Sequence, residues 1–469
     1  MLPSPRTYSL VPSVVPADKS SLMTILSNER AFIFEDGDEY QLKIISVNAD
    51  DSYWNIKTHR MITVTANMGV LEFEIMFEGE QEHTLILMKD EKTIATFSAF
   101  SLLPDLYSRI PLRGDLHSHS CRSDGTRDPS SQFGHFREMG YDFVALTDHN
   151  RYYPGGEIDE TFKGVNTGIT RILGEEVHTP ESVVHIVHVG GKKSVTDEYV
   201  HRRENYEKQI KEYINRVPES IPEKYKVRYG AAMWATDAIH SAGGIAIFPH
   251  PFWIPGASKI YNVCDELAKI LLTSGMFDAY ELIGGMSQSE NNRSIAFWAN
   301  LRAEGLKIPV VGSSDVHNLE DTLHFPGVFT ICFANKKDND SIIEAVKGGY
   351  SVATELCGKD RERQYRCYGD FRLVTYAQFL LKNYFPRLER ITSGAGVAMR
   401  AYAMEEADAS AIETQTAIAE CFTETFFGKR APKKPSKKIL EFEDKWRAVH
   451  KAGPTTKGGS LGAYPGKTT

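Results

Sequence analysis

Two hydrophobic patterns divide the chain. Up to about residue 110, short apolar runs are separated by turn signals such as the EDGD stretch at 35–38. In one run Leu71, Phe73 and Ile75 alternate with acidic residues, which is the period-two pattern of a half-buried strand. We therefore expect an N-terminal all-β domain of sandwich type over residues 1–110. Its expected strands are AFIF, YQLKIISV, MITVTA, VLEFEIMF, HTLILM and TIATFSAFSL.

From residue 111 onward, apolar runs alternate with helical stretches and tend to end in polar residues, which indicates a parallel sheet or barrel. Pro129 stands where a first helical turn tolerates proline, and Gly140 and Gly305 stand where helices end. We expect an α/β domain over 111–369 with an insertion at about 192–230, either a lid or a spacer. The expected strands are PLRGDLH, DFVALTD, TRILGEE, VVHIVHV, GIAIFPH, AYELIG, IPVVGSS and GVFTICF, and the expected helices are 129–139, 197–216, 231–242, 264–274, 290–304 and 341–347.

The C-terminal region has a different composition. Residues 370–427 show a long helical pattern, which we expect to form a helical extension. Residues 428–469 hold eleven Lys or Arg against three Asp or Glu. We expect this basic segment to be a mobile, solvated tail, with a local contact to a phosphate backbone as the alternative.

Composition excludes several classes of protein. The chain has 469 residues and a formal net charge of −8, so no general basic field attracts nucleic acid. No apolar run of about 18 residues is present, so we expect no membrane contact and a cytoplasmic location. The six cysteines are scattered without a C-x-x-C pair, and we expect mostly core thiols and no thiolate zinc site.

The candidate chemistry begins at the end of the first strand of the barrel region. His117 and His119 are two residues apart there, so on an extended segment both imidazoles point to the same side. Later strands end in further imidazole or carboxylate groups. These are Asp124, Asp148, His149, Glu175, Glu176, His185, His250, Asp315 and His317.

This recurrence predicts a metal centre, because the C-terminal rim of a β/α barrel is where loops and strand ends build active sites. Imidazole and carboxylate ligands without thiolate suit zinc, manganese or iron. The number of ligands exceeds what one four-coordinate ion accepts, so we expect two to three divalent ions.

The motifs DLHSHSCRSDG, ALTDHN, GEEV with a downstream His, FPHP and SSDVH resemble the polymerase and histidinol phosphatase (PHP) superfamily over roughly 112–355. The resemblance implies a distorted (β/α)7 TIM-like barrel with up to three metals. One ion would be held by His117, His119, Glu176 and Asp315, a second by Glu176, His185 and His250, and the third by Asp124, His149 and His317.

Two ligand assignments have alternatives. Glu175 is the alternative to Glu176 as the bridging carboxylate. His188 is the alternative to His185, and we favour His185 because apolar neighbours leave His188 a packed role. We expect Asp148 and Asp115 to orient ligands or loops. Candidate contacts to a substrate phosphate are Arg122, Arg151 and His178.

These features favour a metal-dependent phosphoesterase that hydrolyses a phosphomonoester or phosphodiester, including nucleotides, with metal-activated water. Asp124, His149, Glu176 and His250 would serve catalysis by holding the metal-bound hydroxide. No G-x-S-x-G elbow follows an expected barrel strand, and no phosphate-binding P-loop motif is present. The expected partner is a small phosphorylated substrate or short oligonucleotide. The alternatives are an amidohydrolase-like metal hydrolase and a noncatalytic, metal-stabilised binding module.

Overall fold

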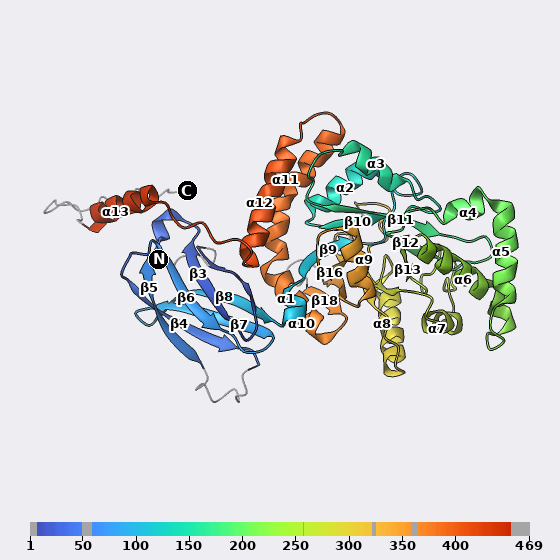
Figure 1. Cartoon of the computed structure of the whole chain (residues 1–469), viewed down its shortest axis with the longest axis horizontal. Helices are drawn as coiled ribbons and strands as arrows, with labels where there is room; N and C mark the ends of the chain where they lie inside the picture. The colour runs from blue at the N-terminus through green and yellow to red at the C-terminus, as the bar shows by residue number, and fades with distance from the viewer. Residues whose placement is uncertain (1–6, 49–58, 257, 321–324, 359–363, 452–469) are drawn as a thin grey trace, which may run out of the picture. The chain divides into compact units, whose positions relative to one another are not determined.

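The computed structural model describes residues 7–48, 59–256, 258–320, 325–358 and 364–451 (Figure 1). The chain forms two compact units. One comprises Met1–Leu103 with Glu424–Thr469, and the other comprises Pro104–Thr423. The first unit is mostly β and the second is mixed α/β.

The first unit contains one eight-stranded sheet with the order β1-β3-β6-β5-β4-β7-β8-β2. Strand β5 pairs with both β4 and β6 and so links two halves of the sheet. Leu42, Leu71 and Leu85 come from different strands yet share one buried core, so the sheet curls around that core. The strands are β1 (Tyr8–Val11), β2 (Val14–Pro16), β3 (Ser20–Ser27), β4 (Glu39–Ser46), β5 (Arg60–Asn67), β6 (Val70–Met76), β7 (Gln81–Lys89) and β8 (Lys92–Leu102).

The first three strands and the AFIF segment differ from expectation. AFIF was expected to be a strand, but Arg30–Phe32 forms a 3-10 turn, η1. Its last two residues, Ile33 and Phe34, are nevertheless buried. The prediction was wrong because a short apolar run next to a turn can supply core side chains without pairing. Three strands that the sequence pattern missed, β1 to β3, lie before this turn.

Part of the basic C-terminal segment contributes to the first unit as helix α13 (Lys437–Lys451). Arg447 donates a hydrogen bond to the carbonyl of Ile33, and Lys434 Nζ lies 2.7 Å from a Glu72 carboxylate oxygen. Ser13 N also donates to Phe426 O over 2.8 Å. The C-terminal residues therefore return to the N-terminal sheet.

The second unit is built on a ten-stranded sheet with the order β15-β14-β13-β12-β11-β10-β9-β16-β17-β18. All eight strands expected from the sequence are present. The sheet is mixed, because β12 runs antiparallel to both of its neighbours and β16 runs antiparallel to β9 and β17. The strands are β9 (Ile110–Asp115), β10 (Phe143–Leu146), β11 (Thr170–Val177), β12 (Ile186–Val189), β13 (Ile245–Phe248), β14 (Ala279–Ile283), β15 (Val310–Gly312), β16 (Val328–Ala334), β17 (Ser351–Cys357) and β18 (Gln364–Tyr368).

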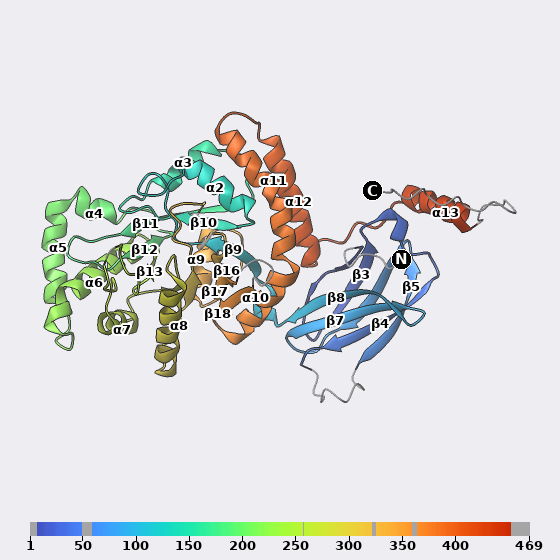
Figure 2. The ribbon, with the colours of Figure 1, turned by 180° about the vertical axis from the view of Figure 1, so that it is seen from behind.

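Helices surround this sheet, with α4–α6 at one end of the unit and α10–α12 at the other (Figures 1 and 2). The expected helices all occur, but the one expected at 197–216 is divided into α4 and α5, and α3 was missed because two glycines follow its first proline. The helices are α1 (Pro104–Tyr107), α2 (Pro129–Glu138), α3 (Pro154–Thr161), α4 (Thr196–Val200), α5 (Arg203–Asn215), α6 (Lys226–Ser241), α7 (Asp265–Thr273), α8 (Gln288–Ala303), α9 (Asn339–Lys347), α10 (Phe371–Asn383), α11 (Phe385–Ala403) and α12 (Ser410–Phe426), with a 3-10 turn η3 at Glu223–Tyr225.

The sheet closes on itself where β15 meets β16 and β17. Thr330 Oγ1 donates to Gly312 O over 2.8 Å and accepts from Gly312 N over 3.1 Å, and Ser351 Oγ donates to Val310 O over 2.9 Å. A Cβ atom on Gly312 would lie 2.7 Å from Phe329 O, so glycine permits this close approach. The result is barrel-like, with interior residues such as Leu112 fully buried.

Two other sequence expectations bear on this fold. Only Cys332 of the six cysteines is buried, and Cys121 and Cys264 are exposed, so the expectation of mostly core thiols was wrong. Cys121 lies in the turn that follows β9, and Cys264 directly precedes helix α7. Side chains at such positions need not be buried. None of the six cysteines, all of which lie in the described ranges, forms a disulfide. Within the described ranges, no helix combines the length and apolar character that crossing a membrane requires.

His83 in β7 generates a prediction for the first unit. Its ring is fully buried, with Nε2 2.8 Å from Ser101 Oγ and Nδ1 3.0 Å from Ser46 Oγ. Ser101 Oγ already donates to Gly79 O over 2.6 Å, so it accepts from Nε2–H and the neutral ring is satisfied. Burial lowers the pKa of His83 to about 4.

We expect the first unit to be fully stable above pH 6.5 and to lose up to about 3 kcal/mol as the pH falls to 4, because only the unfolded chain takes up the His83 proton readily. Urea unfolding followed by pulsed hydrogen exchange of β7 and β8 peptides measures this. His83→Gln should flatten the pH dependence, whereas His59→Gln in the same unit should retain it. An equally steep decline in the His83→Gln protein would contradict the assignment.

Candidate metal centre

The nine expected ligands lie together at one end of the barrel, around the carboxylate of Glu176; eight follow or end their strands, and His185 precedes β12, which runs antiparallel to its neighbours. Glu176 is the seventh residue of β11 and is fully buried. Its Oε1 lies 2.7 Å from His185 Nδ1 and 3.3 Å from His250 Nε2. Its Oε2 lies 2.8 Å from His149 Nδ1 and 3.4 Å from His117 Nε2. One carboxylate therefore faces imidazoles from four separate strand ends.

Asp315 forms a second focus beside it. Its Oδ1 lies 2.9 Å from His119 Nε2 and 3.2 Å from His117 Nε2. Because His119 Nε2 is also 3.5 Å from Glu176 Oε2, the two carboxylates share the same pair of imidazoles. Ligand atoms of His117, His119 and Asp315 all lie within 4.8 Å of one another, so these three residues could contact one ion.

Asp124 forms the third focus, on the open side of the cluster. Its Oδ2 lies 3.3 Å from His149 Nε2 and 3.4 Å from His317 Nε2, and its Oδ1 lies 3.8 Å from His119 Nδ1. The side chain of Asp124 is 52% exposed, whereas that of Glu176 is 1% exposed. The cluster thus runs from a buried floor at Glu176 to a solvent-facing rim at Asp124.

Backbone pairing beyond the named strands holds this arrangement. After β9, His119 N donates to Val316 O over 3.0 Å, and Asp315 N donates to His117 O over 2.9 Å. The segment that carries both histidines is therefore paired with the segment that carries Asp315. His149 and Glu176 form a similar isolated bridge after β10 and β11. Ligand positions are consequently set by the sheet and not by free loops.

Two backbone conformations at the site are unusual for side chains other than glycine. His250 has φ 26° and Asp315 has φ 49°. Positive φ costs about 1–3 kcal/mol for such residues and persists only where surrounding contacts determine it. At both positions the chain turns immediately after a strand, and the turn directs the side chain into the cluster.

Asp115 and Asp148 take the orienting roles expected of them. Asp115 is buried at the end of β9 and accepts hydrogen bonds from His117 N and Ser314 N, each 3.1 Å long. Asp148 accepts from Ser120 N over 2.9 Å and from Ser123 Oγ over 2.6 Å. They fix the loop that follows β9 on both of its sides.

Glu281 is a site residue that the sequence analysis missed. It lies in β14, is fully buried, and its Oε2 is 2.8 Å from Nδ1 of His117. This contact leaves Nε2 of His117 directed at the two central carboxylates. The available signal was a single carboxylate inside the apolar strand AYELI, which a buried strand does not accommodate without a partner.

The alternatives for two ligands are separated by geometry. Glu175 points to the other side of β11, where His188 Nδ1 is 3.0 Å away and Val195 N and Ser194 Oγ donate to its carboxylate. Glu176 and His185 face the cluster instead. The arrangement favours Glu176 and His185 as the ligand pair, and it gives Glu175 the task of anchoring the residues before α4.

The three candidate phosphate contacts lie at different distances from the centre. His178 Nε2 is 3.6 Å from Glu176 Oε1, so it belongs to the cluster itself. Arg122 is on the rim and makes a bidentate pair with Glu157, with Nη2 2.7 Å from Oε2. Arg151 is exposed in the loop after β10. Trp253 adds an aromatic wall, with its ring centre 5.9 Å from that of His185.

The donor set fits divalent ions. Nine-tenths or more of the surface of His117, His119, Glu176 and His250 is buried. Even so, both oxygens of Glu176, Nε2 of His117 and both ring nitrogens of His119 make no hydrogen bond within the described residues. Buried polar atoms without partners are costly, and bound cations would satisfy them.

The charges at the centre agree with cation binding. Burial opposes ionisation of Glu176, but the histidines around it hold its pKa well below the usual range. Asp315 is likewise held ionised by His117 and His119 despite its burial, with its pKa lowered. Burial lowers the pKa of His185 to about 4, so its imidazole is neutral at pH 7 and can donate a lone pair.

The possible ion positions overlap. Four groups have ligand atoms that all lie within 4.8 Å of one another, and the groups share His117, His119, His149 and Glu176. The groups are His119, Asp124, His149 and His317; His117, His119 and Asp315; His117, Glu176 and His250; and His149, Glu176 and His178.

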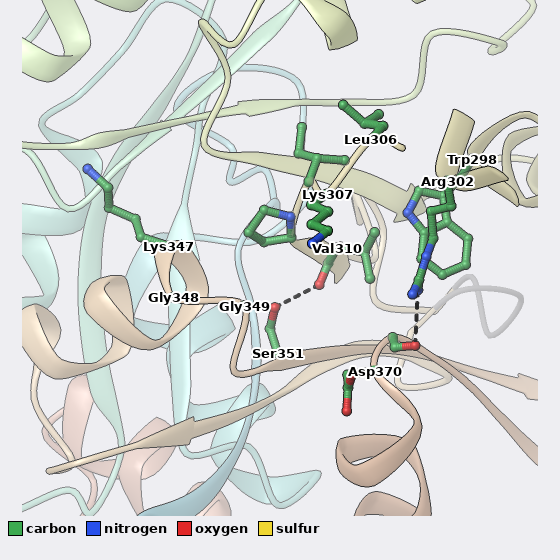
Figure 3. A pocket seen from close by; sticks show the side chains of 13 residues that line it. Trp298, Arg302, Leu306, Lys307, Val310, Lys347, Gly348, Gly349, Ser351 and Asp370 are labelled. Atoms are coloured by element: carbon green, nitrogen blue, oxygen red, sulfur yellow. Dashed lines mark hydrogen bonds between the residues drawn. The ribbon is translucent and has the colours of Figure 1, made fainter. Parts of the chain in front are cut away.

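Two cavities in this unit differ in their relation to the cluster. One, of about 610 Å³, includes His149 and opens between the loop after β10 and helix α4. The other, of about 450 Å³, lies at the start of β15, between α8 and the end of α9 (Figure 3). Figure 3 shows Arg302 bound to the Gly369 carbonyl and Ser351 bound to Val310 there, and none of the nine ligands lines it.

No family model and no curated protein matches the chain. Among solved structures, the chain is similar to a two-domain protein from Bacteroides vulgatus that contains a predicted PHP-like metal-dependent phosphoesterase, with TM-score 0.37, 17% identity, and coverage of 57% of this chain and 78% of that one. It is also similar to a proposed metal-dependent phosphoesterase from Bifidobacterium adolescentis, with TM-score 0.32, 20% identity, and coverage of 44% and 87%.

A third similar structure is an amidohydrolase from Chromobacterium violaceum with bound sulfate and no metal, at TM-score 0.30 and 19% identity, with coverage of 44% and 87%. What is proposed below for activity rests on the geometry of the side chains.

Replacement of the central carboxylate tests the metal centre directly. We expect Glu176→Gln to weaken binding of Mn²⁺ or Zn²⁺ at least 100-fold, because it removes the charge that faces most of the ligands. Titration calorimetry and elemental analysis of dialysed protein measure this. Glu175→Gln is the matched control and should keep the metal content. Equal losses in the two proteins, or no loss in Glu176→Gln, would contradict the assignment.

Glu281 should act on metal affinity through His117. Because it accepts from Nδ1 and holds the ring orientation, Glu281→Ala is expected to lower affinity by about 10- to 100-fold. Glu281→Gln, which keeps an acceptor oxygen, should recover part of the loss. The same titrations report both values, and an unchanged affinity in Glu281→Ala would show that the ring is held by other contacts.

Proposed function

We propose that the protein is a metal-dependent phosphoesterase that uses two to three divalent ions of zinc, manganese or iron. The observation that carries this proposal is the set of overlapping ligand groups around Glu176, which offers more ligand atoms than one ion can use. Clustered divalent ions lower the pKa of water and neutralise phosphoryl oxygens during in-line displacement.

The proposed ligand sets follow the three foci of the cluster. His117, His119, Glu176 and Asp315 would hold the first ion, and Glu176, His185 and His250 the second. Asp124, His149 and His317 would hold the third. His178 is an additional ligand candidate for the second or third position, because its Nε2 lies in the group with His149 and Glu176.

The side chains near Glu176 are buried and those near Asp124 are exposed, so the two groups would have different roles in the reaction. Glu176, His117 and His119 form a floor that excludes water and fixes the positions of the charges. Asp124 and His317, whose side chains are 52% and 38% exposed, form the rim that a substrate meets first. A phosphate group, with several oxygens and a negative charge, is the ligand that such a floor of cations and imidazoles favours.

Two arginines at the rim, Arg151 and Arg122, are candidate contacts to the substrate. Arg151 lies beside His149 in the same cavity, and its guanidinium has no hydrogen-bond or ion-pair partner in the described ranges, so it would contact an anionic or acceptor group of the substrate. Arg122 is already paired with Glu157, so its contribution requires that this exposed pair opens. Exposed pairs of this kind contribute little free energy, and a phosphate can compete with them.

Hydrolysis assays test the proposed function. We expect purified protein with added Mn²⁺ to hydrolyse p-nitrophenyl phosphate or bis-p-nitrophenyl phosphate, and the preference between them distinguishes a monoesterase from a diesterase. His117→Ala should lower kcat/KM at least 1,000-fold, since it removes a ligand shared by two groups. His240→Ala, at an exposed pair with Asp278, is the control and should keep the activity.

Two results would overturn this proposal. Hydrolysis of p-nitroacetanilide in place of both phosphate esters would indicate an amidohydrolase-like enzyme. Bound metal without hydrolysis of any of the three compounds would indicate a noncatalytic binding module.

A further inference from the structure

The cavity of about 610 Å³ beside His149 is the feature of the described structure that the proposed function does not yet use. Its walls come from the loop after β10, the first turn of α3, and α4 within the expected insertion. His149 belongs both to this cavity and to the metal cluster, where its Nε2 is 3.3 Å from Asp124. The cavity is therefore continuous with the rim of the proposed reaction centre.

Most polar side chains of this cavity are already engaged. Arg122 forms its bidentate pair with Glu157, and the hydroxyl of Tyr153 donates to Asp197. The carboxylates of Glu157 and Asp197 are thus compensated within the wall. Arg151 differs, because its exposed guanidinium makes no hydrogen bond or ion pair with any described residue.

Exposed apolar surface lines the same space. The side chain of Tyr153 is 65% exposed and that of Val200 is 52% exposed, which is unusual for large apolar groups on facing elements. The ring of Tyr153 is held edge to face against Tyr152, with ring centres 6.1 Å apart and planes at 88°. This arrangement leaves a fixed aromatic face available for stacking.

The wall formed by α4 is anchored to the barrel. Glu175 accepts hydrogen bonds from Val195 N over 2.6 Å and Thr196 N over 3.3 Å, at the start of α4. Tyr199 of α4 accepts from His178 N over 3.3 Å and donates to Asn150. Because α4 is tied to the loops after both β10 and β11, the cavity is formed before a ligand binds.

We propose that this cavity binds the leaving group of the ester and selects a planar aromatic group, which stacks on Tyr153 and places an acceptor or anionic substituent at Arg151. The proposal rests on the proposed function, because the scissile phosphate must lie at the metal cluster for its alcohol side to enter here. The cavity volume is sufficient for a ring with substituents and lies within the range of small-molecule sites.

Two esters with similar alkyl leaving groups test the selection, benzyl phosphate and glycerol 2-phosphate. We expect wild-type protein with Mn²⁺ to prefer benzyl phosphate at least tenfold in kcat/KM. Tyr153→Ala should reduce this preference to about twofold by raising KM for benzyl phosphate, with kcat and the glycerol ester unchanged. Tyr153→Phe is the matched control, because it keeps the ring and should keep the preference.

A second pair of esters, 4-carboxybenzyl phosphate and benzyl phosphate, tests the role of Arg151. We expect 4-carboxybenzyl phosphate to exceed benzyl phosphate about fivefold in kcat/KM for the wild type, and Arg151→Gln should remove this gain. Arg203→Gln, at an exposed helical position outside the cavity lining, is the control. A gain that survives in Arg151→Gln overturns the role of Arg151.

A binding measurement separates this inference from the proposed function. Calorimetry with nonhydrolysable benzylphosphonate and methylphosphonate should show at least tenfold tighter binding of the aromatic compound by wild type and Tyr153→Phe, but not by Tyr153→Ala. Equal binding of both compounds, or an unchanged preference in Tyr153→Ala, overturns the inference even if esters are hydrolysed. Absence of hydrolysis together with a Tyr153-dependent preference overturns only the phosphoesterase proposal.

Discussion

The charge of Glu176 is the constraint on which the second unit depends. This carboxylate is fully buried, and its two oxygens lie 2.7–3.4 Å from ring nitrogens of His185, His250, His149 and His117. Burying an ionised group costs several kcal/mol unless the surrounding groups compensate it. The strand ends around Glu176 therefore have to supply that compensation in a fixed geometry. Under the proposed function, bound cations would add to this balance and would favour the folded state of this region.

The barrel supplies the precision that such a centre needs. Pairing between the segments after β9 and β15 places His117 and His119 opposite Asp315, and Asp115 fastens both segments with one buried carboxylate. Gly312 lets the sheet close at the same strand. Closure and ligand placement are thus parts of one hydrogen-bond network. By contrast, the rim around Asp124 depends on a loop, which suits a position that must admit substrate.

Periodicity and motif position predicted much of this arrangement. Apolar runs located all eight expected barrel strands, and polar residues at their ends located the nine clustered side chains, because strand ends in one sheet share an edge. Glu281 was missed since its partner, His117, is distant in sequence and only the folded sheet brings them together. The strand predicted at AFIF was wrong for a related reason, because a residue can be buried in the core without pairing in the sheet. His178 directly follows β11 and was expected to contact a substrate phosphate; its place among the candidate ligands became evident only in the fold.

The left-handed backbone at His250 and Asp315 has a consequence for the evolution of this chain. Each conformation favours glycine, and each residue adds a buried polar group that the metal-free fold does not need. Selection for thermal stability alone would therefore replace His250 and Asp315 early. Their replacement by glycine would remove both the backbone strain and the cost of placing a polar group in the cluster. The presence of both residues in this one chain is what a trade of stability for chemistry predicts at these positions. A laboratory selection for more stable variants should therefore find substitutions of His250 and Asp315 early, and these substitutions would also abolish the proposed activity.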